Sequence, residues 1–310
     1  MNNKLIALCL GTTVACTAPT KDTPDDTYVS SLDTSEADTA ILAEPLPTPD
    51  FSQRGSYEVF EEESTASVTN CPNMSYTIYS PVDVLQPPVV VLAHGFARGA
   101  KSMTGWAEHL ASWGVEVLLP TLCHYNVLSG VGHEMNGRNM NELATTHGAL
   151  NVIYAGHSAG GLAAIIAASH DSKALGVLGL DATDTEDIPN VPDYIGREYA
   201  SNVTIPALSL LAESSVCNSA NNGLDLFQMM EDYHAIKVTS ADHCDFESPT
   251  DWVCESSCEN TTAEFTDEEI RPVITTLGTS AILSLAGLST TVWTEDLEVW
   301  TNTGIIQILE

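Results

Sequence analysis

The chain has 310 residues, 44% of them hydrophobic, which is enough to bury the core of one large domain or two small ones. It carries 42 acidic and only 10 basic side chains, a formal net charge of -32. Such a charge argues against nucleic acid and anionic lipid as electrostatic partners. It fits high solubility or adaptation to a salty environment, where salt screens repulsion between carboxylates.

The N-terminal segment, residues 1–16, is typical of a secretory signal, because a lone lysine precedes an apolar run too short to span a bilayer. The Val-Ala-Cys sequence that ends at Cys16 resembles the lipobox of bacterial lipoproteins, with Thr13 in the place of the usual leucine. We therefore expect an exported protein. It is either a lipoprotein of the cell envelope, attached to the outer membrane or surface only through a lipid on Cys16, or a protein secreted after cleavage near Ala18.

Residues 17–66 are rich in threonine, aspartate and proline and poor in large apolar side chains. Such a segment cannot bury enough surface to offset the entropy lost on ordering. We predict that it is a disordered acidic linker, extended by its own charge. Residues 67–310 are predicted to form a single folded domain.

This domain contains an even number of cysteines, which in an exported chain predicts up to three disulfides. The cysteines are Cys71, Cys123, Cys217, Cys244, Cys254 and Cys258. The short spacing of the last two also fits a zinc site, but His243 is the nearby imidazole and no second pair of ligands follows. Structural disulfides are the favoured interpretation.

Strand and helix patterns alternate along the domain, which indicates an α/β fold with a mostly parallel sheet covered by helices on both faces. Apolar runs predict buried strands at residues 87–95, 115–120, 151–156, 174–181, 203–213 and 234–243. Amphipathic or small-residue patterns predict helices at residues 102–114, 161–170 and 265–288.

Gly156, Ser158 and Gly160 form a G-x-S-x-G motif where a predicted strand meets a predicted helix. The two glycines permit a strained turn that exposes the serine hydroxyl at the end of the sheet, as in a nucleophile elbow. The following helix adds its positive dipole end, which favours negative charge near the hydroxyl. The alternative is that Ser158 merely caps the helix.

A nucleophilic serine needs a base, and the base needs a carboxylate to orient it, so both are sought downstream of Ser158. His170 lies in the elbow's own helix and His234 begins a strand, whereas His243 follows the last predicted parallel strand. We therefore favour His243 as the base.

Two strand ends offer the carboxylate, Asp181 and Glu213, and the pattern alone does not choose between them. Asp184, Glu186 and Asp187 follow the first of these in a segment typical of a solvated loop.

The sequences of residues 89–120 (VVVLAHGFARGAKSMTGWAEHLASWGVEVLLP) and 156–161 (GHSAGG) resemble those of the α/β-hydrolase superfamily. Within it, they are similar to the group of chlorophyllases, platelet-activating-factor acetylhydrolases and cutinase-type polyester hydrolases. The resemblance covers roughly residues 76–287 and implies an α/β-hydrolase catalytic domain without a separate lid domain. GLDATD resembles the acid-bearing strand end of the first two families and implies Asp181 as the acid, with Glu213 in reserve.

The loop ADHCDFES, which contains His243 and Phe246, resembles the histidine loop of the acetylhydrolases. The resemblance implies a serine carboxylic-ester hydrolase that acts through an acyl-enzyme, with backbone amides of Phe96 and Ala159 as the oxyanion hole. It requires no metal or organic cofactor. We expect a monomer that acts on a small-molecule or polymeric ester.

Three further expectations concern the surroundings of this site. The cysteines that flank it suggest Cys217–Cys244, Cys254–Cys258 and Cys71–Cys123 bridges, although other pairings remain open. Residues 121–144 are expected to wall the acyl pocket, with side chains that include His133, Met135 and Met140. The segment 182–202 is too short for a lid domain, which favours an open cleft and small or extended esters.

Other functions remain compatible with these residues. A peptidase or thioesterase would use the same triad, and a surface lipoprotein could keep the fold for binding without catalysis.

Overall fold

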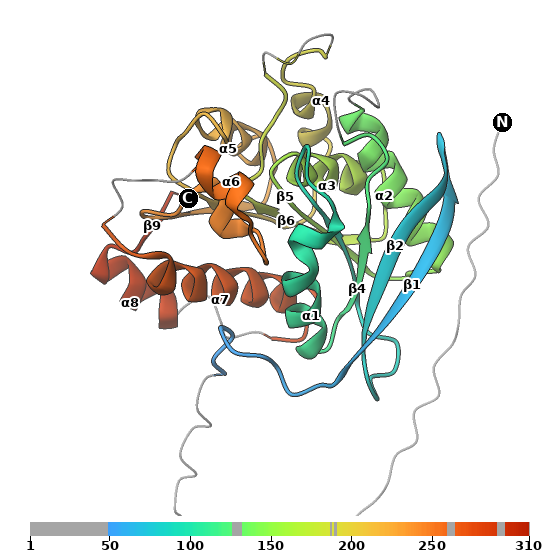
Figure 1. The fold of residues 1–310 in the computed structure, drawn as a ribbon, viewed down its shortest axis with the longest axis horizontal. Helices are drawn as coiled ribbons and strands as arrows, with labels where there is room; N and C mark the ends of the chain where they lie inside the picture. Colours follow the sequence, from blue (N-terminus) through green and yellow to red (C-terminus); the bar gives the residue numbers. More distant parts are fainter. Residues whose placement is uncertain are drawn as a thin grey trace, which may run out of the picture. The chain divides into compact units, whose positions relative to one another are not determined.

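The computed structural model describes residues 49–125, 132–186, 188, 191–258, 264–289 and 295–309 (Figure 1). Its strands are β1 (Val59–Val68), β2 (Cys71–Pro81), β3 (Val89–Ala93), β4 (Glu116–Pro120), β5 (Val152–His157), β6 (Ala174–Leu180), β7 (Ala207–Leu211), β8 (Tyr233–Val238) and β9 (Ile306–Ile308). Its α-helices are α1 (Thr104–Ser112), α2 (His133–His147), α3 (Ala159–Ser169), α4 (Gly196–Ala200), α5 (Gly223–Phe227), α6 (Trp252–Cys258), α7 (Asp267–Leu285) and α8 (Glu295–Thr303). Short 3₁₀ helices are η1 (Ala100–Met103), η2 (Ser219–Asn221) and η3 (His243–Phe246).

The described strands form one nine-stranded sheet with the order β1-β2-β4-β3-β5-β6-β7-β8-β9. The pairings from β4 across to β8 are parallel. Antiparallel strands close both edges, the β1–β2 hairpin at one and β9 at the other. The predicted α/β class with a mostly parallel sheet is confirmed.

Helices cover both faces of this sheet, and the central strands are therefore apolar throughout. Along β3, Val90 and Leu92 join one buried cluster while Val89 and Val91 join the other, because successive side chains of a strand point to opposite faces. The first cluster includes side chains of α1 and α7, and the second includes side chains of α2 and α3. Figure 1 shows α1 and α7 on one side of the sheet and α2 and α3 on the other.

Every strand and helix predicted in the domain is present, with ends shifted by a few residues. The predicted linker ends earlier than residue 66. Strand β1 begins at Val59, inside the segment 17–66 that was expected to be disordered, and Phe51 is buried against Trp113 with ring centroids 4.7 Å apart. Exposed glutamates line this edge strand, and their acidic composition concealed the strand pattern. Residues 1–48, which include Cys16, lie outside the described residues.

Three disulfides join cysteines of the domain, as is typical of proteins that fold outside the reducing cytosol. Among the described helices, none combines the length and the apolar character needed to cross a membrane.

Candidate active site

Ser158 occupies the sharp turn between β5 and α3. Its φ of 56° and ψ of -127° are unfavourable for a residue with a side chain, and such strain is found mostly at functional sites. The turn is held from within, because the Ser158 amide donates to the carbonyl of Leu180 (3.1 Å) and its carbonyl accepts from the amides of Gly161 (2.9 Å) and Thr183 (3.2 Å). Ser158 is thus the strained elbow residue that the motif predicted.

The two glycines of the motif are required by close backbone packing. A Cβ atom added to Gly156 would lie 2.3 Å from the carbonyl carbon of Gly160, and one added to Gly160 would lie 2.5 Å from the carbonyl oxygen of Ala93. No side chain fits at either position without moving β5 or α3. The glycines therefore allow the elbow helix to approach the sheet closely.

The carboxyl ends of neighbouring parallel strands carry the predicted functional residues. Phe96 follows β3, Ser158 follows β5, Asp181 follows β6 and His243 follows β8. This edge of a parallel sheet is where α/β proteins generally bind ligands.

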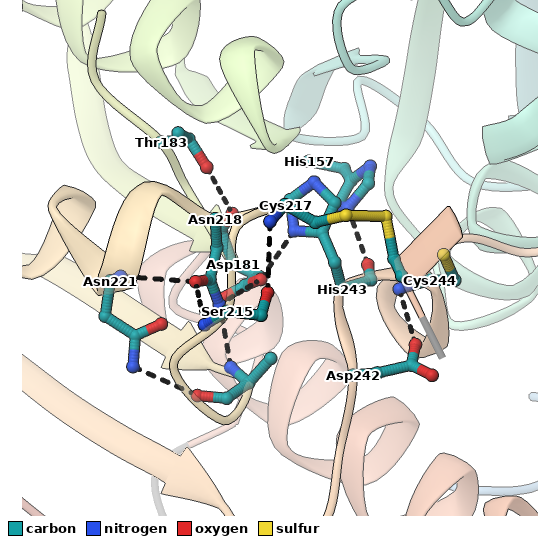
Figure 2. Close-up of polar contacts among 12 residues, drawn as sticks. His157, Asp181, Thr183, Ser215, Cys217, Asn218, Asn221, Asp242, His243 and Cys244 are labelled. Carbon is teal, nitrogen blue, oxygen red and sulfur yellow. Dashed lines mark hydrogen bonds and ion pairs between the residues drawn. A yellow bond between two sulfur atoms is a disulfide. The ribbon is translucent and has the colours of Figure 1, made fainter. Parts of the chain in front are cut away.

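His243 is hydrogen-bonded to Asp181, with 2.6 Å between Nδ1 and Oδ2 (Figure 2). Asp181 is fully buried, and its other carboxylate oxygen accepts from the amide of Ala212 (2.9 Å). The amide nitrogen of the Asn218 side chain donates to Oδ2 from 3.1 Å. The carboxylate is therefore fixed on several sides and orients the imidazole.

His157 supports the same loop from behind. Its Nε2–H donates to the backbone carbonyl of His243 (2.9 Å), and the two ring centroids are 4.5 Å apart. Burial holds the pKa of His157 well below its ordinary value, and the neighbouring His243 lowers it further. The ring is therefore neutral, which matches a single donated hydrogen bond.

An ion pair links the loop after β3 to the loop after β8. Arg98 binds Glu247 through two hydrogen bonds, Nε to Oε1 (2.7 Å) and Nη2 to Oε2 (2.6 Å). The Glu247 side chain is fully buried, and Arg98 also contacts the exposed Asp251 (3.1 Å). The hydrogen bond to Glu247 raises the pKa of Arg98, and the one from Arg98 lowers the pKa of Asp251. Such a two-pronged contact fixes geometry as well as charge.

Backbone amides of Phe96 and Ala159 belong to residues that lie beside Ser158. Both residues line the same cavity as Ser158, and neither amide has a hydrogen-bond acceptor within the described ranges. The loop that carries Phe96 approaches Ser158 so closely that a Cβ atom on Gly95 would lie 3.1 Å from the serine Cβ. The two amides are therefore available to an oxyanion at Ser158.

His94 holds this loop rather than facing the cavity. Its Nε2 accepts from the amide of Leu122 (3.0 Å) and its Nδ1 contacts the carbonyl of Gly95 (2.9 Å). Burial lowers the pKa of His94 to about 4, so the ring stays neutral.

Ser158 and His243 both line a cavity of about 380 Å³ at this edge of the sheet. No hydrogen bond joins their side chains in the part of the chain that the structure describes. Bonds between nucleophile and base are often long without substrate. The cavity is bounded by the loop after β3, the start of α3, the loop after β6 and helix α6.

Three other candidates point elsewhere. The Glu213 carboxylate binds Lys237 (3.1 Å) and the amide of Ser240 (3.4 Å) instead of an imidazole. His170 and His234 are exposed and do not line the cavity. Asp181 and His243 are thus the acid and base candidates that the fold brings together.

The predicted wall segment contributes one of its three named side chains. His133 lines the cavity, whereas Met140 is fully buried in the core under α2. Met135 lies away from the cavity, where its sulfur contacts the side-chain amide of Asn70 (3.8 Å). The expected lining by the two methionines was wrong for two reasons. Met135 lies on the opposite side of α2 from His133, and Met140, on the same face as His133 but two turns further along, is buried in the core.

One of the three expected disulfides is confirmed and two were wrong. The structure contains Cys71–Cys123, Cys217–Cys258 and Cys244–Cys254. The error arose from α6, a helix that was not predicted. Cys254 and Cys258 lie one turn apart on it, so each reaches a separate loop beside the site.

The side chains that position His243 were not predicted. His157 was visible only as the neighbour of Ser158, and Glu247 only as one of many glutamates. Asn218 and Arg98 had no local pattern. Pairings between distant loops leave no periodic signal in a single sequence.

Metal binding has little support among the described residues. The sulfur atoms of Cys244, Cys254 and Cys258 lie within 4.8 Å of one another, but all three are in disulfides and offer no thiolate.

No protein-family model matches this chain, and a search of curated proteins finds no match. Its function is therefore inferred from the geometry of the site.

Proposed function

We propose that the protein is a serine-dependent carboxylic-ester hydrolase with an α/β-hydrolase fold. One observation carries the proposal: the strained Ser158 shares a cavity with an imidazole that is already hydrogen-bonded to a buried carboxylate. A serine that only capped α3 would need neither the strained turn nor such a partner, and its side chain makes no cap hydrogen bond.

The protonation states follow from the contacts of His243. Because Nδ1–H donates to Asp181, the unprotonated Nε2 is free to accept the proton of Ser158. The serine oxygen attacks the ester carbonyl, and the amides of Phe96 and Ala159 stabilise the oxyanion.

The intermediate collapses when His243 returns the proton to the leaving alcohol, which leaves an ester of Ser158. Water then attacks this acyl-enzyme, with His243 again as the base, and releases the acid. Asp181 stays ionised and stabilises the imidazolium in both steps.

The surroundings of the site support small or extended esters as substrates. The cavity is partly open, and the described part of residues 182–202 contains a single five-residue helix, α4. Hydrolysis of nitrophenyl acetate, butyrate and palmitate tests the size preference, and a strong preference for palmitate would contradict it.

We propose further that the protein is exported, either anchored through a lipid on Cys16 or secreted.

A fluorophosphonate probe, which reacts with activated serines, tests the proposed nucleophile. We expect the folded protein to be labelled and Ser158→Ala to lose both labelling and ester hydrolysis. Ser169→Ala, at the other end of α3, is the matched control and should keep both. Folded protein that takes up no label would contradict catalysis and support a binding role.

The type of leaving group is tested with matched ester, thioester and amide substrates. We expect the highest kcat/KM for the ester. Faster turnover of the thioester or amide would reassign the protein to one of those hydrolase classes.

A further inference from the structure

Two buried polar side chains on the cavity wall lack partners. His133 and Asp184 are each only 3% exposed, and both line the cavity. Among the described residues, neither ring nitrogen of His133 nor Oδ2 of Asp184 has a hydrogen-bond partner. An unsatisfied buried polar atom is costly, so such atoms in a cavity indicate where a ligand supplies the missing hydrogen bonds.

His133 lies on the oxyanion side of Ser158. It lines the cavity together with Phe96 and Ala159, and the same three residues border a second, narrow hollow. The His133 and Phe96 ring centroids are 5.9 Å apart. In the tetrahedral intermediate the oxyanion and the leaving group occupy different corners. Because His133 lies beside the oxyanion donors, it is separate from the leaving alcohol, which receives its proton from His243.

Asp184 lines the cavity from the loop after β6. Its Oδ1 accepts from the amides of Thr185 (2.8 Å) and Gly196 (2.9 Å), which fixes the carboxylate and leaves Oδ2 unused. A Cβ atom on Gly196 would lie 2.7 Å from Leu162, which lines the cavity on the first turn of α3. Asp184 is therefore near the helix that begins with Ala159.

We propose that His133 and Asp184 form a polar acyl subsite, which selects esters whose acyl chain carries a hydroxyl group close to the scissile carbonyl. This inference rests on the proposed ester hydrolase function. A hydroxyl is both a donor and an acceptor: its hydrogen binds Oδ2 of Asp184, and its oxygen accepts from an N–H of His133. A plain acyl chain would leave both groups unsatisfied.

The electrostatics of the two side chains agree with this assignment. Burial lowers the pKa of His133 to about 4, so the ring is neutral and keeps one N–H for donation. Burial raises the pKa of Asp184, while its hydrogen bonds from backbone amides oppose the rise. Two neighbouring polar side chains of this loop are already engaged, since Glu186 binds Tyr194 and Thr185 binds the carbonyl of Pro192.

The decisive measurement is the ratio of kcat/KM for nitrophenyl beta-hydroxybutyrate to that for nitrophenyl butyrate. We expect a ratio of about ten or more for the full-length protein, since hydrogen bonds to charged groups are stronger than neutral ones. His133→Phe and Asp184→Asn should each lower the ratio several-fold. His133→Gln, which keeps an N–H donor, should retain more of the preference than His133→Phe.

His170→Phe, which replaces an exposed histidine at the end of α3, is the matched control and should leave the ratio unchanged. Fluorophosphonate labelling of Ser158 in each variant shows that the fold and nucleophile are intact. Hydrolysis of nitrophenyl butyrate with a wild-type ratio near one, or a ratio that His133→Phe does not change, overturns the subsite alone.

An equal loss for both substrates in labelled His133→Phe also overturns the subsite, because it would indicate an oxyanion donor. Absence of both labelling and ester hydrolysis in the wild-type protein overturns the proposed function and the subsite with it.

Discussion

The turn after β5 and the loop after β8 hold their functional side chains by different means. At the turn, the main chain fixes Ser158. Strand β5 and helix α3 are packed so closely that only glycine fits at positions 156 and 160, and this holds the backbone of Ser158 between them. Both flanking elements are buried on all sides. The position of Ser158 is thus a consequence of core packing.

In the loop after β8, side chains and a disulfide fix His243. Asp181 holds the ring, His157 holds the backbone carbonyl, and the disulfide of the next residue, Cys244, ties the loop to α6. These contacts come from separate segments of the chain. Substitutions around His243 should therefore reduce the proposed activity with less effect on folding than substitutions at the turn.

The largest effect on activity short of removing Ser158 is expected for Asp181→Asn. Loss of the carboxylate charge would leave His243 in the wrong tautomer, which in known serine triads lowers kcat by roughly 10⁴-fold. Asparagine keeps an oxygen for the amide of Ala212, so the fold should be retained. The measurement is kcat for a nitrophenyl ester, with circular dichroism to check the fold.

Glu213→Gln is the matched control for this prediction, and kcat should change by less than about threefold, since its carboxylate binds Lys237. A large loss in Glu213→Gln with a small one in Asp181→Asn would reassign the acid.

The second prediction concerns the ion pair between the two loops. Glu247→Gln removes the buried partner of Arg98, and we expect the free energy of unfolding to fall by about 3 kcal/mol. Asp251→Asn breaks the exposed contact of the same arginine and should lower the free energy of unfolding far less, because solvent screens this contact. Urea unfolding followed by tryptophan fluorescence measures both. Equal losses would show that the buried contact has no special role.

Removal of the Cys244–Cys254 disulfide should destabilise the protein slightly less than Glu247→Gln does. Unlike a general loss of stability, it should also lower kcat directly. It closes a separation of 10 residues, for which loop entropy gives about 2–3 kcal/mol. The Cys244→Ser, Cys254→Ser double variant should therefore lose that stability and also lower kcat, because α6 is no longer tied to the base loop.

Leu143→Ala is a control that removes a fully buried side chain from α2 at a similar cost in stability. It should keep kcat at temperatures well below unfolding. If both variants lower kcat equally, the disulfide acts only through global stability.

The sequence predicted the elements whose pattern is local. Continuous apolar runs predicted the central strands, and the G-x-S-x-G motif predicted the strained turn at Ser158. His243 and Asp181 could be proposed because each directly follows such a strand, and the structure brings them into contact. The choice of Asp181 over Glu213 came from a family resemblance, since both end buried strands.

Contacts between distant loops could not be predicted in the same way. The pairing of four cysteines near α6 depends on a seven-residue helix without a clear sequence pattern. The β1 strand was missed because its exposed face is acidic and resembles the linker before it. The orphan nitrogens of His133 become visible only when burial and partners are known.

The last prediction concerns the pH dependence of stability. His94 and His133 have pKa values of about 4 in the folded protein because they are buried, below the 6.5 of an exposed histidine. Between these values the unfolded chain binds protons that the folded chain does not, so stability falls as the pH falls. From pH 7 to pH 5 the loss should be about 2 kcal/mol for each of these histidines.

Asp245 opposes this trend. Burial raises its pKa to about 6 from an ordinary 3.8, so between these values the folded chain binds the extra proton and gains stability as the pH falls. We expect His133→Phe to flatten the decline in unfolding free energy from pH 7 to pH 5 and Asp245→Asn to steepen it. The exposed His234→Phe is the control and should leave the slope unchanged. Urea titrations at each pH measure the slope, and a slope that His133→Phe leaves unaltered would mean that this ring titrates as freely in the folded protein as in the unfolded chain.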